Sequence, residues 1–372
     1  MIQLRSTIDA DGTLRLSLDE VEMPTPAAHE VVIRIEATPI NPSDLGLLLA
    51  TVDPSTLHSS VDAAGRPVTT GMCAEATLPA LAARIGESMP VGNEGGGTVV
   101  AAGESPEAQA LLGRVVGAAG GAMYAQYRAV AAASCIAMPE GVTPAQAASP
   151  FVNPLTALGM VETMRMEGHS ALVHTAAASN LGQMLNRLCI ADGVALVNIV
   201  RRPEQVALLR SAGASFVCDS SAPDFPAQLT AALTETKATI AFDATGGGTL
   251  AGTILSCMER AASVGAAYSR YGSATHKQVY LYGRLDLNPV QLNSGSVGMA
   301  WGLGGWLLTP FIGKVGGERF AQLRDRVAAE ITTTFASEYS EQISLEAALD
   351  PAVIRRYQAK ATGSKFLIVP SH

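Results

Sequence analysis

The pattern of apolar and polar residues differs between the two halves of the chain. Up to about residue 135 it favours strands: Leu14 to Leu18 alternates, and Val31 to Ala37 is a strong strand candidate. The run from Val115 to Tyr127 reads as two strands joined by a hairpin. Beyond it, a helical pattern extends from Pro144 to Met164. We therefore expect β structure first, and strands that alternate with helices afterwards.

The alternating region is organised around one βαβ unit. Ala171 to Val173 is typical of a buried strand, and a run of small residues follows from Thr175 to Gly182. A helical period then covers Leu181 to Ile190, and Val194 to Val200 is a second strand-like run. Small residues in such a turn let the backbone approach a pyrophosphate, and the helix N-terminus offers unpaired N–H groups.

Strands and helices continue to alternate after this unit. Helices are expected at 203–213, 225–233, 250–258 and 318–332, and strands at 214–219, 238–244, 277–283, 342–344 and 365–369. Strict alternation indicates an α/β fold with a doubly wound parallel sheet. Ligands of such sheets bind beyond the carboxyl ends of the strands. Thr175 to Gly182, Arg201, Thr245 to Gly247 and Tyr282-Gly283 are therefore expected at one edge.

The turn after the first strand departs from the Gly-x-Gly-x-x-Gly fingerprint of dinucleotide sites. Ala176, Ser179 and Gly182 hold the three positions, so only the last glycine is kept. An NAD site has an acidic residue at the end of the second strand, whereas this chain has Asn198 followed by Arg201-Arg202. Two guanidiniums suit a 2′-phosphate, which favours NADPH over NADH. The alternative is that both arginines begin the next helix as solvated charges.

The candidate cofactor-binding residues lie in the turn after the first strand or at the expected carboxyl edge of the sheet. Two neighbours are interpreted as structural: His174 as a hydrogen-bonded residue at the strand end, and Asp243 as a cap for the loop that follows it. The candidates are Thr175, Ala176, Ser179, Asn180, Leu181, Gly182, Asn198, Arg201, Arg202, Thr245, Gly246, Tyr282 and Gly283.

Composition narrows the class of protein. The 372 residues are 48% hydrophobic and 16% charged, which suffices for two domains with large cores. A net charge of −8 without a basic block argues against a nucleic acid or an anionic membrane as partner. Five scattered cysteines without a Cys-x-x-Cys pair indicate free thiols in a reducing cytoplasm. We expect a cytoplasmic protein that acts on a small molecule.

Two stretches were considered as membrane or targeting segments. The first residues, MIQLRSTIDADG, lack the apolar core of a signal peptide. The stretch from Val297 to Val315 is apolar but is interrupted by Pro310 and Lys314. We interpret it as a buried or subunit-facing segment.

Several short motifs together resemble the medium-chain dehydrogenase/reductase superfamily, over nearly the whole chain. They are Asn41-Pro-Ser-Asp44, Gly92-Asn-Glu-Gly95, Asn153-Pro-Leu-Thr-Ala157, the βαβ unit, Phe242-Asp-Ala-Thr-Gly-Gly247 and Tyr282-Gly283. The resemblance implies a GroES-like β-rich catalytic domain made from both chain ends, residues 1–150 and 318–372. It also implies a Rossmann NADPH-binding domain at 151–317, an active site in the cleft between the domains, and a homodimer.

Within this superfamily the residues at the metal positions separate the branches. Zinc alcohol dehydrogenases carry Cys, His and Cys where this chain has Asn41, Asn93 and Val152 or Asn153. Amide and valine side chains do not replace thiolate and imidazole on Zn²⁺, and the four-cysteine lobe is also absent, so we expect no metal. This matches the zinc-independent quinone oxidoreductase branch, which implies hydride transfer from NADPH to a quinone or another electron-poor carbonyl or alkene.

Two other functions stay open. The enoyl thioester reductase branch shares Asn-Pro-Ser-Asp, Gly-Asn-Glu-Gly and the Val-Arg end of the second strand. That branch carries a catalytic tyrosine after Asn-Pro-Ser-Asp, whereas no tyrosine occurs between Leu45 and Met123 here. Lens crystallins of the superfamily bind NADPH as packing proteins, and the eroded glycine pattern fits such a non-catalytic protein.

The resemblance also suggests roles for three catalytic candidates. Asn41 and Thr156 are expected near the nicotinamide, where they hold its carboxamide or the substrate oxygen. Asn93 is expected to face the vacated metal position. The alternative for both asparagines is a structural turn residue. The long segment from Ala50 to Pro90 is interpreted as a cover over the substrate cleft, and the proton donor is either solvent or an unidentified hydroxyl.

Overall fold

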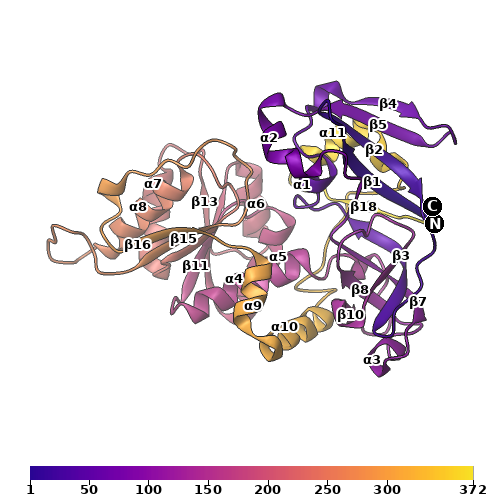
Figure 1. Ribbon diagram of the computed structural model, residues 1–372. Coiled ribbons are helices and arrows are strands. Elements are labelled where there is room, and N and C mark those ends of the chain that lie inside the picture. The colour runs from indigo at the N-terminus through magenta and orange to yellow at the C-terminus, as the bar shows by residue number, and fades with distance from the viewer. Residues whose placement is uncertain (372) are drawn as a thin grey trace. The chain divides into compact units, whose positions relative to one another are not determined.

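The computed structural model describes residues 1–371, which fall into two compact units (Figure 1). Unit 1 comprises Met1–Val152 and the stretch that begins at Arg324, and unit 2 comprises Asn153–Leu323. Unit 1 is therefore built from two distant parts of the sequence, while unit 2 is continuous.

The unit boundaries differ from the expected ones. The first falls after Val152 instead of after residue 150, and the second lies inside helix α10 (Gly317–Ala329) instead of before it. The two halves of α10 have different partners: Arg319 donates to the carboxylate of Glu162 at 2.8 and 3.0 Å, and Arg324 donates to the carbonyl of Ala133 at 2.7 Å. A sequence pattern marks the start of a helix, but not where the partners of its side chains change.

The first sheet of unit 1 contains five strands, all from the N-terminal part of the chain. Its strands are β1 (Ile2–Ile8), β2 (Thr13–Glu20), β4 (His58–Val61), β5 (Pro67–Met72) and β6 (Met89–Pro90). They lie in the order β4-β5-β2-β1-β6. Leu14, Leu16 and Leu18 are buried along β2, as its alternating pattern predicts. Segment 50–90 thus supplies three strands of this sheet.

The second sheet of unit 1 joins both parts of the sequence. Its strands are β3 (Glu30–Pro39), β7 (Glu94–Ala102), β8 (Val115–Ala119), β9 (Tyr127–Ala131), β10 (Cys135–Ala137), β17 (Glu341–Ile343) and β18 (Phe366–Ile368). They follow the order β10-β8-β7-β3-β18-β17, and β9 also pairs with β3. The C-terminal strand β18 runs antiparallel to β3, with Leu367 opposite Pro39.

The predicted hairpin between residues 115 and 127 is wrong. Strand β8 pairs with β7 and β10, while β9 pairs with β3. The connecting residues bond elsewhere, because Tyr124 N–H donates to the carbonyl of Val91 and the Tyr124 carbonyl accepts from Leu4 N–H. The backbone hydrogen bonds of this connection therefore tie it to other segments.

Short helices cover the sheets of unit 1. They are α1 (Leu45–Leu48), α2 (Leu78–Leu81), α3 (Pro106–Gln109) and α11 (Pro351–Gln358). A buried apolar cluster joins α1, α11 and the first sheet, and it includes Leu4, Leu48 and Ile354. Helix α11 begins at Pro351, and the carboxylate of Asp350 accepts from the N–H groups of Ala352 and Val353 as its cap.

Unit 2 is built on a six-stranded parallel sheet. Its strands are β11 (Ala171–His174), β12 (Ala195–Val200), β13 (Phe216–Asp219), β14 (Ile240–Asp243), β15 (Lys277–Leu281) and β16 (Trp301–Gly305). The order β13-β12-β11-β14-β15-β16, with parallel neighbours throughout, is that of a doubly wound dinucleotide-binding sheet.

Helices lie on both faces of this sheet (Figure 1). The helices of unit 2 are α4 (Val152–Met166), α5 (Asn180–Asp192), α6 (Pro203–Ser211), α7 (Phe225–Thr236), α8 (Leu250–Ala262), α9 (Leu308–Val315) and the first part of α10. Val197 and Ile199 of β12 pack in the cluster that holds α7 and α8, whereas Val200 packs with Leu209 of α6. No helix among residues 1–371 is long and apolar enough to cross a membrane.

The predicted helix from Pro144 begins later than expected. Residues Gln146–Ala148 form only a short 3-10 turn, and α4 starts at Val152. The N–H groups of Phe151 and Val152 donate to the carboxylate of Glu94 at 2.8 and 2.9 Å. A tertiary contact thus breaks a run that is helical in its local pattern.

Glycines in β7 allow its close pairing with β3, and this can be tested. A Cβ atom on Gly97 would lie 1.9 Å from the carbonyl oxygen of Arg34. We expect Gly97→Ala to lower the free energy of unfolding by about 1–3 kcal/mol, because the two strands must separate. The measurement is urea unfolding.

The matched control is Gly46→Ala in α1, where a Cβ atom would meet nothing within 4 Å. This change is expected to be neutral or to stabilise by up to about 1 kcal/mol. Equal unfolding curves for the two variants would contradict the steric argument for Gly97.

Candidate functional site

The carboxyl edge of the parallel sheet brings together loops that carry most of the cofactor candidates. In the register of the sheet, His174 lies beside Asn198 on one side and Phe242 on the other. The turn from Thr175 to Gly182 follows β11, Arg201-Arg202 follows β12, and the other loops follow β14 and β15. Parallel pairing therefore places all four loops at one edge, as predicted.

The turn after β11 has a glycine at only one of the three positions of the Gly-x-Gly-x-x-Gly pattern, Gly182. Ala176 adopts a positive φ of 51°, a conformation that costs an alanine about 1 kcal/mol or more. Ser179 caps α5, and its hydroxyl accepts from Gly182 N–H at 3.1 Å. A Cβ atom on Gly182 would lie 2.2 Å from the carbonyl oxygen of Ala177, so this position has no room for a side chain. Asn180 and Leu181 form the first turn of α5.

Thr175 and Asp243 join the loops after β11 and β14. The carboxylate of Asp243 is fully buried and accepts from the Thr175 hydroxyl at 2.7 Å and from Thr245 N–H at 2.9 Å. It also accepts from Gly246 N–H at 3.2 Å, so Asp243 caps this loop as predicted. The Thr175 hydroxyl in turn accepts from Ala244 N–H at 2.8 Å. Thr175 therefore holds the two loops together.

A cavity of about 1120 Å³ lies in unit 2 beside these loops. Gly246, Tyr282 and Gly283 line it together with Trp306 and residues of α4 and α9. A Cβ atom on Gly246 would lie 2.0 Å from the carbonyl oxygen of Gly283, so the two loops need glycine to pack this closely. Three of the predicted residues thus share one concave site.

A buried histidine supports the tyrosine in this cavity. His174 Nε2 lies 2.7 Å from the hydroxyl of Tyr282, and the two rings stack with centroids 5.7 Å apart. Burial lowers the pKa of His174 to about 3, so its ring is neutral at pH 7. Burial also raises the pKa of Tyr282. His174 is therefore a hydrogen-bonded strand-end residue, as interpreted, and Tyr282 keeps its proton.

The residues at the end of β12 differ in their access to solvent. Asn198 is fully buried, and its Nδ2 donates to Oδ1 of Asn186 in α5 at 3.3 Å, so it does not reach the open edge. Arg201 and Arg202 are exposed, and Arg202 occupies the N-cap position of α6 without a side-chain capping bond. Of the three residues, only the arginines offer their side chains to a ligand.

In unit 1, one aspartate brings two catalytic candidates together. Asp44 is buried, and its carboxylate accepts from Asn41 N–H at 2.8 Å and from Asn93 N–H at 2.9 Å. Burial raises the pKa of Asp44 to about 7, against the opposing effect of these two hydrogen bonds. The motifs Asn41-Pro-Ser-Asp44 and Gly92-Asn-Glu-Gly95 therefore meet at this side chain.

Glu94 is the second buried carboxylate of this cluster. Its Oε1 accepts from Asn41 Nδ2 and from the Ser149 hydroxyl, both at 2.8 Å. Its Oε2 accepts from the backbone N–H groups of Phe151 and Val152. Four donors therefore satisfy a side chain that is only 1% exposed.

A buried lysine completes the cluster. Lys365 Nζ donates to the Ser149 hydroxyl at 3.2 Å and to the Ser337 hydroxyl at 3.4 Å, and it lies 5.3 Å from the ring centre of Tyr339. Burial lowers the pKa of Lys365 to about 8, while Glu94 and Asp44 oppose the shift. Because Ser149 bonds to both, the lysine and the carboxylate of Glu94 are linked through one hydroxyl.

Sequence reasoning missed the polar groups that hold this cluster. Asp44 and Glu94 lie in motifs that it quoted; it considered Asp44 only as a helix cap, a bond that the Asp44 side chain does not make, and it gave Glu94 no role. A signal was available at Glu94, since a carboxylate directly before three glycines in a buried strand needs internal donors. Ser149 and Lys365 offered no comparable signal.

The third catalytic candidate, Thr156, lies in a different unit from the two asparagines. Thr156 lies on the buried side of α4 in unit 2, whereas Asn41 and Asn93 lie in unit 1. Within residues 1–371, no group of three or more His, Cys, Asp or Glu side chains is arranged to hold a metal ion.

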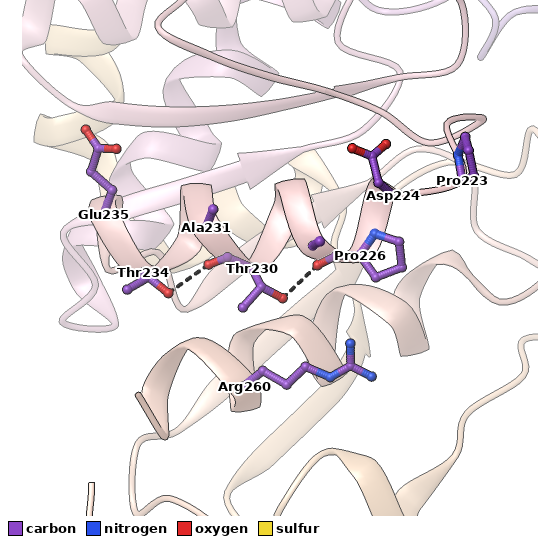
Figure 2. Close-up of a pocket in the computed structure, with 9 residues that line it drawn as sticks. Pro223, Asp224, Pro226, Thr230, Ala231, Thr234, Glu235 and Arg260 are labelled. Carbon is purple, nitrogen blue, oxygen red and sulfur yellow. Dashed lines mark hydrogen bonds between the residues drawn. The ribbon is translucent and has the colours of Figure 1, made fainter. Parts of the chain in front are cut away.

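A second cavity of about 830 Å³ lies along α7 and α8 (Figure 2). The hydroxyls of Thr230 and Thr234 in its wall donate to carbonyls of the same helix, those of Pro226 and Thr230. None of the predicted site residues lines this groove, and we assign it no chemistry.

The raised pKa of Asp44 predicts how stability depends on pH. Between its ordinary value of 3.8 and about 7, the folded carboxyl keeps a proton that the unfolded one loses. The protein therefore loses stability as the pH rises through this range. Replacing Asp44 by Asn removes this loss, so the stability difference between wild type and variant should shift by about 2 kcal/mol between pH 5 and pH 7.

Urea unfolding at the two pH values measures this shift. Asp11→Asn is the control, because Asp11 is exposed and hydrogen bonds from Thr13 lower its pKa. A wild type that keeps the same stability relative to Asp44→Asn at both pH values would refute the assignment.

Comparisons with known proteins agree on the architecture. No family model and no curated protein sequence matches the chain. A Mesorhizobium loti protein provisionally named an NADPH:quinone reductase has a TM-score of 0.72 and 24% identity, covering 100% of this chain and 98% of its own. A mycobacterial protein complexed with NADPH has a TM-score of 0.68 and 19% identity, covering 100% of both chains.

A third solved structure belongs to the other reductase branch. A mutant form of an enoyl thioester reductase from Candida tropicalis has a TM-score of 0.64 and 17% identity, covering 99% of both chains. At such identities the likeness concerns the fold. The chain therefore shares the fold of these reductases over its whole length, which confirms the predicted fold class.

Proposed function

We propose that this protein is an oxidoreductase that uses NADPH to reduce a quinone or another electron-poor carbonyl or alkene. The observation that carries the proposal is the carboxyl edge of the unit 2 sheet. There, Gly182 lets α5 pack closely against the turn after β11, Ser179 caps that helix, and Arg201 and Arg202 are exposed beyond the next strand.

The residues at this edge fit the parts of NADPH. The first turn of α5 suits the pyrophosphate, because its backbone N–H groups and the helix dipole favour an anion. Arg201 and Arg202 would bind the 2′-phosphate. Gly246, Tyr282 and Gly283 would border the nicotinamide in the cavity of about 1120 Å³. When bound, NADPH supplies a hydride, and the chain's own part is to orient the cofactor and exclude water.

We further propose that the reaction needs no metal. Asn41 and Asn93 carry amides at the positions where zinc enzymes of this fold have thiolate and imidazole ligands. Quinones and enones accept hydride with little activation, which favours them as substrates. We also propose that the protein is a cytoplasmic homodimer. All five of its cysteines are free and buried, which is consistent with a reducing compartment.

Reduction of an enoyl thioester is the second candidate, because one structural neighbour is named an enoyl reductase and another an enoyl thioester reductase. Such a reaction needs a positioned proton donor. No tyrosine occurs between Leu45 and Met123, and the hydroxyl of Tyr282 is engaged with His174. These observations favour the quinone over the thioester.

Initial rates of NADPH oxidation test the proposal directly. The assay uses 1,4-benzoquinone and a crotonyl thioester in parallel, each with and without a chelator. We expect turnover of the quinone that the chelator does not change. Turnover of the thioester alone would favour the second candidate, and loss of activity with the chelator would overturn the metal-free reaction. Tight NADPH binding without any turnover would favour a non-catalytic protein.

The arginine pair predicts a preference between cofactors. In a variant with Arg201→Ala and Arg202→Ala, the KM for NADPH should rise by about tenfold or more, because the 2′-phosphate loses its charge-assisted bonds. The KM for NADH, which lacks that phosphate, should stay within about twofold of the wild-type value. Steady-state kinetics with both cofactors measures the change.

Arg270→Ala is the control. Arg270 is exposed and precedes β15, so it belongs to the opposite edge of the sheet. An equal rise of both KM values in the double variant would show that the arginines do not recognise the 2′-phosphate.

A further inference from the structure

The cavity of unit 2 extends beyond the loops at the carboxyl edge of the sheet. Tyr282 lines it at that edge, and Tyr280, two residues earlier on β15, lines it as well. Side chains two positions apart on a strand share one face, so the cavity continues inward along the face of the sheet. We call this region the inner part of the cavity; it is lined by Tyr280, Met166, Trp306 and Phe311.

The walls of the inner part are aromatic and packed against one another. Trp306 meets Phe242 edge to face with ring centres 5.8 Å apart, and it lies against Phe311 at the same distance. Phe242 also stacks on Tyr280, with ring centres 5.7 Å apart. Gly159 of α4 lets this group approach the helix, since a Cβ atom there would lie 2.9 Å from Trp306 and 3.1 Å from Phe311. The rings therefore form one preformed surface.

The polar atoms of these rings are already paired. Trp306 Nε1 donates to the hydroxyl of Thr163 at 3.0 Å, and the Tyr280 hydroxyl donates to the carboxylate of Glu167 at 2.7 Å. Burial and the bond to Glu167 raise the pKa of Tyr280 to about 12, so this hydroxyl keeps its proton. The charged residues that line the cavity are exposed and therefore lie at its rim: Glu167, Arg284 and Lys314. The inner walls thus offer apolar contacts.

The size of the cavity indicates a ligand larger than a single ring beside the nicotinamide. At about 1120 Å³, it slightly exceeds the usual range of pockets that enclose a drug-sized ligand. Apolar walls gain free energy when apolar surface covers them, because they cannot form hydrogen bonds with water. Planar rings in particular pack well against a further planar ring, stacked or edge to face.

We propose that the inner part of the cavity binds the second ring of a fused-ring quinone, so that the hydride acceptor of this protein is a naphthoquinone-type compound. This inference rests on the proposed function, because the quinone ring itself would lie at the carboxyl edge, beside the residues proposed for the nicotinamide. The second ring would lie against Tyr280, Trp306 and Phe311. The inference adds no chemical step to the hydride transfer already proposed.

Two probes that accept no hydride test this site without any turnover. 2-Naphthol and phenol differ by one fused ring, and calorimetry gives their dissociation constants with and without NADP⁺. The readout is the ratio of these constants, phenol over 2-naphthol. In the wild type this ratio should be about tenfold or more, because the additional ring buries apolar surface in the inner part.

Two substitutions remove apolar surface from the cavity. Phe311→Ala deletes a wall of the inner part, and Leu307→Ala deletes a side chain that lines the same cavity. Each should lower the naphthol ratio by about fivefold. Because Leu307 is 64% exposed, its variant keeps the test valid if Phe311→Ala fails to fold.

Each variant has a matched control outside the cavity. Phe225→Ala matches Phe311→Ala, since Phe225 is equally buried but packs in the cluster that holds α7 and α8. Leu112→Ala matches Leu307→Ala, since Leu112 is an exposed leucine of unit 1. Both controls should keep the naphthol ratio within about twofold of the wild-type value.

Turnover then tests whether the hydride acceptor occupies the site. The measured quantity is kcat/KM for 1,4-naphthoquinone divided by kcat/KM for 1,4-benzoquinone, with NADPH saturating. Comparing this quotient between wild type and variants cancels the different reactivity of the two quinones. It should fall by about fivefold in Phe311→Ala and Leu307→Ala and stay within about twofold in the controls.

Two results would overturn the inference. One is a naphthol ratio that stays within about twofold of the wild-type value in both cavity variants. The other is a quinone quotient that stays unchanged in both variants although the naphthol ratio falls, since the acceptor would then not use this site. Absence of NADPH oxidation with either quinone, together with the expected naphthol ratios, would contradict the proposed function and confirm the apolar site alone.

Discussion

The buried carboxylate of Glu94 is the interaction on which the candidate site of unit 1 depends. A charge that is 1% exposed is stable only when its oxygens are bonded, and here four donors converge on it from two segments of the chain. This requirement draws in the loop after β3, the stretch that precedes α4, and through Ser149 the lysine before β18. The start of α4 and the orientation of the Asn41 amide both follow from it.

The carboxyl edge of the unit 2 sheet depends on the backbone conformation of its loops more than on a complete glycine motif. The three fingerprint positions have three separate roles. Ala176 adopts the positive φ that turns the chain, and Ser179 caps the N-terminus of α5. Gly182 lets the helix pack close to the turn. Only the last of these excludes every side chain. The loops after β14 and β15 behave alike, since their glycines are needed where backbone meets backbone, as at Gly246 and Gly283.

Local patterns predicted the parts of this structure whose causes are local. The βαβ unit and the parallel sheet follow from the periodicity of apolar residues, and parallel strands bring their following loops to one carboxyl edge. The structure confirms these three features. The errors lie where distant residues decide. The hairpin at 115–127 fails because Tyr124 bonds to Val91 and Leu4, and the helix expected from Pro144 starts late because Glu94 takes its N–H groups. The link from Lys365 to Ser149 spans 216 residues and has no local signature.

The discontinuous make-up of unit 1 has a consequence for the order of folding during synthesis. Unit 2 is continuous, so all its strands leave the ribosome before β18 does. Until then, β3 lacks its antiparallel neighbour at Pro39, and Glu94 lacks the ammonium of Lys365. Residues 1–152 therefore gain this last strand pairing of β3 and the nearby positive charge only after unit 2 has been synthesised. Any chaperone that protects unit 1 during this interval would have to bind residues 1–152, which are synthesised before unit 2.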